Sequence, residues 1–171
     1  MRVRLGTDAD IPSIERIVKS VIPLMQAVGN MQWDERYPLR DDFATDVIRS
    51  NLWVAVDDED NVAGFAALTK DSSNEYAYAG CDLSIPAVVP HRMAVDTAYR
   101  GQGVAQLLFI RAEELARELG YTLVRVDTNS FNVPMCSLIV RYGYAWKGYV
   151  NLPGHGNTKF NCYEKDIFQS H

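Results

Sequence analysis

Two closely spaced glycines lie between an apolar stretch and an amphipathic pattern. Residues 93–108 read MAVDTAYRGQGVAQLL, which includes Gly101 and Gly103. Glycine lets backbone N–H groups converge without a Cβ in the way, and a helix N-terminus adds partial positive charge. The stretch therefore suits a phosphate or pyrophosphate, whose outer oxygens Arg100 could contact. A tight strand-to-helix turn without a ligand would explain the same glycines equally well.

Two nucleotide-binding motifs are excluded by the residues around these glycines. A Walker A loop needs Gly-Lys-Ser or Gly-Lys-Thr, a triplet that the sequence lacks. A Rossmann fingerprint needs a third glycine, where this chain has Gln106.

The six residues from Arg100 to Ala105, RGQGVA, resemble the Q/R-x-x-G-x-G/A pyrophosphate motif of the GNAT superfamily. This superfamily comprises acyl-CoA-dependent N-acetyltransferases. Residues 132–150 resemble its N-x(10)-G-F/Y element, and the matching positions are Asn132, Gly143 and Tyr144. The resemblance is strong over residues 89–150, and the order of predicted elements extends it over the chain. It implies transfer of an acetyl group from acetyl-CoA, without a metal, to a primary amine of a small molecule or peptide. The amine would attack directly in a ternary complex.

The resemblance also implies a binding site for acetyl-CoA. Backbone groups of Met93 and Val95 would pair with the pantetheine arm, and Asn132 would hydrogen-bond near its cysteamine end. The N–H groups of residues 101–105 would hold the pyrophosphate. The full set of implied cofactor-binding residues is Met93, Val95, Arg100, Gly101, Gln102, Gly103, Val104, Ala105 and Asn132. The N–H of Val95 would also stabilise the tetrahedral oxyanion.

An amine with a pKa of roughly 10.4 must lose a proton before it attacks a thioester. The family often places a glutamate on the strand before the motif, but residues 87–91 hold no carboxylate. Strand alternation predicts that His91 shares a face with Met93 and Val95, so His91 is a candidate base. A half-buried histidine bonded to a carbonyl is the alternative. Asp127, with Asn129, could instead order a water, or Asp127 could cap the next loop.

The proton donor for the leaving thiolate is not evident. Seven residues after Asn132 the family often has a tyrosine, where this chain has Ile139. Tyr142 should point elsewhere on the helix, and Cys136 is a poor substitute. Ile139 and the missing glutamate therefore keep a second function open, a non-catalytic acyl-CoA-binding sensor or interaction module. Release of CoA thiol with a panel of amines would distinguish the two.

An aromatic and acidic segment is expected to form the acceptor pocket. Trp33, Asp34, Glu35 and Tyr37 occur where the family builds this pocket, and an aromatic wall with a carboxylate suits a cationic amine. Trp33 and Tyr37 could instead anchor the segment to the core. Arg92 could pair with an acid in the core or line the same pocket.

The elements that position these residues follow from hydrophobic periodicity and turn signals. Strands are expected at residues 2–5, 52–56, 62–68, 87–95, 121–127, 144–150 and 158–166. Helices are expected from residue 11, around 43–48, and over 104–119 and 133–142, and Pro23 should kink or end the first. Residues 70–84 are expected to form a loop with at most an edge strand. These elements predict a single mixed α/β (α+β) domain over residues 1–171. The resemblance implies a GNAT-like fold, in which the central sheet is mostly antiparallel, contains a splayed strand pair and is flanked by about four helices.

Composition sets the class of protein. The chain has 171 residues, 47% of them hydrophobic, and a net charge of −5. It can bury a full core, while its acidity argues against a nucleic-acid partner. No apolar run approaches about 18 residues and the first residues do not resemble a signal peptide, so no membrane association is expected. Cys81, Cys136 and Cys162 lack CxxC spacing, which suits a reducing cytoplasm. The closing hairpin could support a homodimer.

Overall fold

The computed structural model describes residues 1–168. Within these residues, seven strands and four α-helices follow one another in the predicted order, with short 3-10 turns between some of them. The strands are β1 (Arg2–Leu5), β2 (Leu52–Val56), β3 (Val62–Thr69), β4 (Ala87–Val95), β5 (Leu123–Asn129), β6 (Ala145–Asn151) and β7 (Lys159–Asp166). The helices are α1 (Ile11–Ala27), α2 (Arg40–Ile48), α3 (Val104–Glu118) and α4 (Val133–Arg141).

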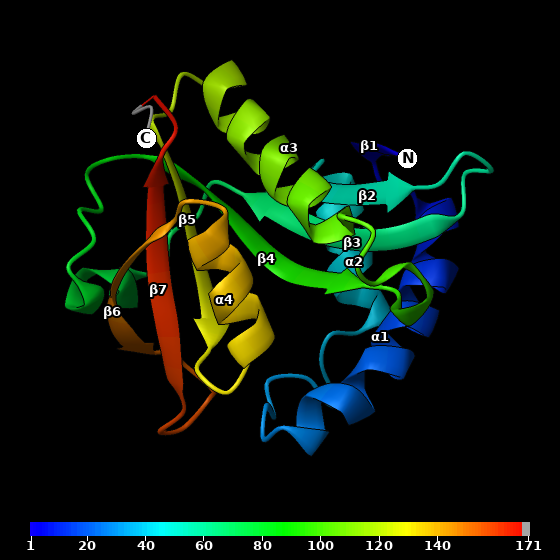
Figure 1. The fold of residues 1–171 in the computed structure, drawn as a ribbon, viewed down its shortest axis with the longest axis horizontal. Helices are drawn as coiled ribbons and strands as arrows, with labels where there is room; N and C mark the ends of the chain where they lie inside the picture. The colour runs from blue at the N-terminus through cyan, green and yellow to red at the C-terminus, as the bar shows by residue number, and fades with distance from the viewer. Residues whose placement is uncertain (169–171) are drawn as a thin grey trace.

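All seven strands belong to one sheet, in the order β1-β2-β3-β4-β5-β7-β6. Every neighbouring pair is antiparallel except β4 and β5. Helices α3 and α4 cover one face of the sheet, and α1 and α2 pack on the other face over its N-terminal half (Figure 1). The mixed α/β fold with a mostly antiparallel sheet is therefore confirmed.

The parallel strands β4 and β5 separate soon after they begin. Their pairing consists of Ala87 with Leu123 and Val88 with Val124. Beyond these pairs β4 bends away from β5, as Figure 1 shows. Backbone groups on the facing edges of both strands are thereby left for another partner, which confirms the expected splayed strand pair.

A β-bulge interrupts β4 at Arg92, two residues after Pro90. Ala94 lies opposite Phe65 of β3, whereas His91 lies opposite Ala67. Three residues of β4 thus span the same distance as two of β3, which is the definition of a bulge. Arg92 has a φ of 45°, in the left-handed region that non-glycine residues rarely adopt. The bulge reverses the side-chain alternation on which the sequence-based assignment of His91 depended.

The structure decides two local expectations. Helix α1 does not end at Pro23 but continues to Ala27. The segment 70–84 is a loop without a strand, as expected, and it contains the 3-10 turn η2 (Asn74–Ala79), whose Tyr76 is fully buried. Among residues 1–168, no helix is long and apolar enough to cross a membrane.

Candidate active site

The glycine-rich loop leads directly into α3. Gly101 and Gly103 have φ values of 76° and 80°, and a Cβ on either residue would meet no atom within 4 Å. Within residues 1–168, no protein acceptor receives the N–H groups of Gly101, Gly103, Val104 or Ala105. The N–H of Gln102 is different, because it donates to the Tyr99 carbonyl at 3.3 Å. Four of the five expected N–H donors are therefore free beside open space.

A glycine on β3 allows the start of α3 to lie against the sheet. A Cβ on Gly64 would come within 2.7 Å of Val104 Cγ1 and 2.9 Å of the Ala94 carbonyl oxygen. Any larger residue would push the first turn of α3 outwards, together with its free N–H groups. Gly64 therefore helps to hold the loop beside the end of β4.

The backbone of Val95 faces the gap between β4 and β5. The Asp96 N–H donates to Ala63 on β3 at 2.9 Å, and the Ala94 carbonyl also points towards β3. In a trans peptide the C=O and the following N–H point in opposite directions. Both the N–H and the C=O of Val95 are therefore directed away from β3, into the gap.

The bulge brings His91 and Asp127 to the same face of the sheet. Met93 and Val95 pack towards α3 and α4. His91 instead lies on the same face of the sheet as Ala94, which is turned away from these helices. The expectation that His91 shares a face with Met93 and Val95 is therefore wrong. Val126 belongs to the core beneath α3 and α4, so the alternating Asp127 also points to the opposite face.

The pKa values of these two groups reflect burial and mutual attraction. Burial lowers the pKa of His91 below its ordinary value, although the charge of Asp127 and the backbone of Asp71 oppose this effect. Burial raises the pKa of Asp127, while a hydrogen bond from Tyr76 and the charges of His91 and His155 act in the other direction. The imidazole is thus neutral near physiological pH, and the aspartate lies close enough to affect it.

Tyr76 is a site residue that the sequence analysis missed. Its Oη donates a hydrogen bond to Asp127 Oδ2, and the tyrosine is fully buried. Asp127 thus accepts from η2 and does not cap the loop after β5. Asn129 does so instead, because its Oδ1 accepts the Phe131 N–H at 2.9 Å. A single buried tyrosine in an irregular segment gives no periodic signal in the sequence.

Arg92 connects the site to α2 and to the segment after α1. Its Nε and Nη2 donate to the Asp46 carboxylate at 2.9 and 2.7 Å, and its Nη1 donates to Tyr37 Oη at 3.2 Å. Asp46, also absent from the expected residues, is buried. Of the two roles open for Arg92, the structure supports pairing with an acid in the core. Tyr37 is thereby held beside Arg92, the neighbour of His91 in the chain.

The expected acceptor-pocket residues are not all brought together. Trp33 is only 3% exposed and stacks on Phe65, so it anchors the segment to the core. The Asp34 carboxylate accepts from the Arg36 side chain at 2.6 Å, which lowers the pKa of Asp34. Glu35 is exposed to solvent. Tyr37 is the member of this group that contacts β4.

The residues considered for the proton donor lie on α4. Ile139 is fully buried in the core beneath α3 and α4. The Tyr142 ring packs edge-on against Phe109 with centroids 5.6 Å apart, and burial raises the pKa of its hydroxyl. Cys136 Sγ accepts from the Asn161 amide on β7 at 3.4 Å. Asn132 caps α4, since its Oδ1 accepts the Met135 N–H at 3.4 Å.

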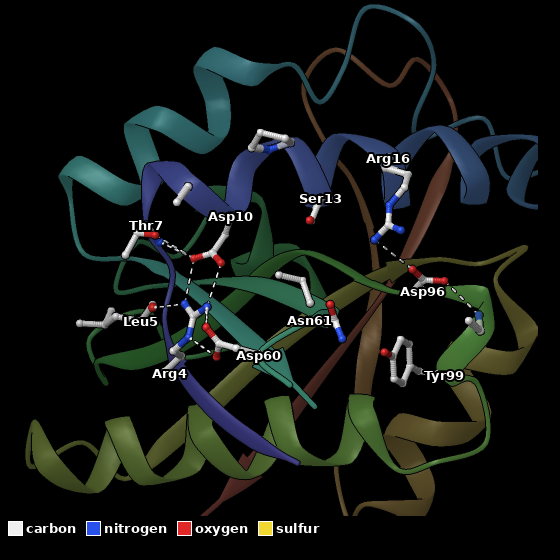
Figure 2. A pocket seen from close by; sticks show the side chains of 14 residues that line it. Arg4, Leu5, Thr7, Asp10, Ser13, Arg16, Asp60, Asn61, Asp96 and Tyr99 are labelled. Atoms are coloured by element: carbon white, nitrogen blue, oxygen red, sulfur yellow. Dashed lines mark hydrogen bonds and ion pairs between the residues drawn. The ribbon is translucent and has the colours of Figure 1, made fainter. Parts of the chain in front are cut away.

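A hollow of about 1020 Å³ lies beside β1, the turn between β2 and β3 and the residues that follow β4. Figure 2 shows the side chains that line it. Several of its side chains are already paired; for example, Arg4 donates to Asp10 at 2.8 Å and to Asp60 at 3.1 Å. Tyr99, from the turn before the glycine loop, also lines it and donates to Asp57 at 2.6 Å. The hollow contains neither His91 nor Asp127. The hydrogen bond between Tyr99 and Asp57 braces the turn before the glycine loop, whereas the pairs of Arg4 join β1 to Asp10 and to the turn between β2 and β3.

Comparison with known proteins identifies the family. The family model described as Acetyltransferase (GNAT) family matches residues 21–144. The chain therefore belongs to the GNAT family and is an acetyltransferase, and the family uses acetyl-CoA. Among curated proteins, none matches the chain.

Solved structures share this fold over nearly the whole chain. A GNAT acetyltransferase from Streptococcus agalactiae is 25% identical, with a TM-score of 0.79 and coverage of 96% of this chain and 94% of that one. A ribosomal-protein-alanine N-acetyltransferase from Brucella melitensis is 19% identical, with a TM-score of 0.70 and coverage of 97% and 99%. The protein yncA from Salmonella typhimurium, solved with its cofactor acetyl-CoA, is 17% identical, with a TM-score of 0.69 and coverage of 100% and 96%. The last two similarities concern the fold alone.

Proposed function

We propose that this protein transfers the acetyl group of acetyl-CoA to a primary amine of a small molecule or peptide, by direct attack in a ternary complex. The observation that carries the proposal is that the gap between β4 and β5 has backbone groups suited to acetyl-CoA on one side and a candidate base with its carboxylate on the other. The free N–H groups of the glycine loop and the backbone of Val95 border it on the side of α3. His91 and Asp127 share the opposite face.

The loop residues fit the pyrophosphate of acetyl-CoA. An anion is favoured where several unpaired N–H groups meet a helix N-terminus, and the open space at Gly101 and Gly103 would admit it. Arg100 is exposed and adds a positive charge at the same place. Met93 and Val95 would hold the pantetheine arm by strand-like hydrogen bonds. Acetyl-CoA supplies the thioester.

We assign His91 as the base that removes a proton from the acceptor ammonium, directly or through a water. Its lowered pKa keeps the imidazole neutral and able to accept a proton near neutral pH. Asp127, held by Tyr76, would stabilise the imidazolium that forms. The N–H of Val95 would stabilise the oxyanion of the tetrahedral intermediate. The hydrocarbon side chain of Ile139 cannot act as an acid, so water would protonate the leaving thiolate.

The acceptor would approach from the face that carries His91, beside Tyr37. Arg92 lies on this side but is already paired with Asp46, so its charge repels a cationic amine less than a free guanidinium would. Trp33 packs on Phe65 and Asp34 is paired with Arg36, so Tyr37 is the residue of this segment that we place in the pocket. We also propose a cytoplasmic location, which the free thiols of Cys81, Cys136 and Cys162 support.

The test combines acceptor screening with a pH profile. CoA release from acetyl-CoA is measured with a panel of primary amines, and kcat/KM of the best acceptor is followed with pH. We expect the rate to fall on the acid side as His91 becomes protonated, with a midpoint below about 6.5. In His91→Gln this acid limb should disappear and the rate should fall by about 10²–10⁴.

The comparison variant is His155→Gln. His155 packs against Phe160 at a centroid distance of 5.1 Å, and its charge lowers the pKa of Asp127, so its replacement should shift the midpoint of the acid limb without removing the limb. An unchanged pH profile in His91→Gln would refute the assigned base. Binding of acetyl-CoA without CoA release for any amine would instead favour the non-catalytic acyl-CoA-binding module.

A further inference from the structure

Two cysteines far apart in the sequence meet where the segment 70–84 packs on the sheet. Cys81 follows η2, and Cys162 lies in the middle of β7. Their Sγ atoms are 3.5 Å apart, although the residues are separated by 81 positions. Neither takes part in the proposed acetyl transfer.

We propose that Cys81 and Cys162 form a redox modification site, at which hydrogen peroxide converts the two thiols into a disulfide. A disulfide needs an S–S distance of about 2.05 Å, so the sulfurs must approach by about 1.5 Å. Cys162 is held in a strand, whereas Cys81 lies outside the regular strands and helices. Movement of Cys81 can therefore supply the approach.

The surroundings favour Cys81 as the sulfur that reacts first. Cys81 is 6% exposed and Cys162 is fully buried. The hydrogen bond with Cys162 lowers the pKa of the Cys81 thiol, and the nearby Arg125 guanidinium adds to this effect, while burial and Glu164 oppose it. The hydrogen bond and burial raise the pKa of Cys162. A thiolate is the reactive form of cysteine, so Cys81 is the nucleophile.

The reaction balances with one peroxide. The Cys81 thiolate attacks one oxygen, the O–O bond breaks, and the leaving hydroxide takes up a proton, which gives water and a sulfenic acid. The sulfur of Cys162 then attacks the sulfur of Cys81, the S–O bond breaks, and a second water leaves. Two thiols and one hydrogen peroxide thus yield one disulfide and two waters.

The disulfide would fasten the segment 70–84 to the sheet. Buried Arg125 already holds this segment, because it donates to Ser72 Oγ at 2.9 Å and to the Asp82 carbonyl at 3.1 Å. The turn η2 lies beside β6, visible as the short green helix in Figure 1. A covalent link across 81 positions would restrict the unfolded chain strongly. We therefore expect the melting temperature to rise by roughly 5–15 °C on oxidation.

The test uses the full chain, hydrogen peroxide and a thiol-alkylating reagent under denaturing conditions. The reduced protein should take up three alkyl groups, one for each cysteine. After peroxide treatment we expect alkylation of Cys136 alone, a cross-linked peptide containing Cys81 and Cys162, and full reversal by dithiothreitol. The melting temperature should rise as stated.

Two variants act as controls. Cys136→Ser should still form the cross-link, because Cys136 does not take part. Cys81→Ser should lose both the cross-link and the rise in melting temperature. Alkylation of all three cysteines after peroxide, or irreversible oxidation of single sulfurs without a cross-link, would overturn the proposal. Both results are read on the parent protein, so neither depends on the stability of a variant or on acetyl transfer.

Discussion

The ion pair between Arg92 and Asp46 should contribute strongly to stability. The Asp46 side chain is 4% exposed and that of Arg92 is 20% exposed, and two hydrogen bonds of 2.7 and 2.9 Å join them. Asp46→Ala would leave the guanidinium mostly buried and without its carboxylate. Breaking a buried pair in this way costs about 3–5 kcal/mol. Because Arg92 retains some contact with water and with Tyr37, we expect about 3 kcal/mol.

The assay is urea unfolding monitored by circular dichroism. For a chain of this length, the expected loss corresponds to a fall in melting temperature of about 6–12 °C. Asp41→Asn on the same helix is the matched control, since Asp41 is exposed, and it should change stability by at most about 0.5 kcal/mol. The double variant Asp46→Ala/Arg92→Met should lose less than the sum of the single losses, because it leaves no unpaired charge. A cost below about 1 kcal/mol for Asp46→Ala, or strict additivity, would refute the reasoning.

Three further outcomes are expected. Gly103→Val should weaken acetyl-CoA binding by about 10–100-fold in calorimetry, because valine is strained at a φ of 80° and fills the open space; unchanged affinity in a folded variant would contradict the assigned pyrophosphate site. Tyr142→Phe should keep kcat within about twofold, since the ring packs on Phe109, and a loss of about 100-fold would show that this hydroxyl donates the proton. The pKa of Asp57 is lowered to about 2, chiefly by the hydrogen bond from Tyr99. Ionised Asp57 therefore stabilises the fold at pH values above the pKa that it has in the unfolded chain. Asp57→Asn should therefore lower the melting temperature at pH 7, and the difference should shrink as the pH falls from about 4 to 2; a difference that persists at pH 2 would count against this linkage.

The sequence alone was sufficient for features that depend on neighbouring residues. The glycine loop, the start of α3 at Val104 and the hairpin of β2 and β3 were predicted closely, because turns and amphipathic patterns are local properties. The approach of α3 to the sheet was less accessible, since it depends on Gly64, which lies 40 positions before Val104. Even so, the family motif was enough to predict the class of enzyme.

Only the tertiary structure decided which side chains meet at the site. A single bulge at Arg92 moves His91 from the face of Met93 to that of Asp127, and strict alternation cannot reveal such a shift. Tyr76 and Cys81 reach β5 and β7 because a segment without periodicity folds over the sheet. These contacts depend on the register and packing of segments far apart in the chain, so local sequence patterns carry no signal for them.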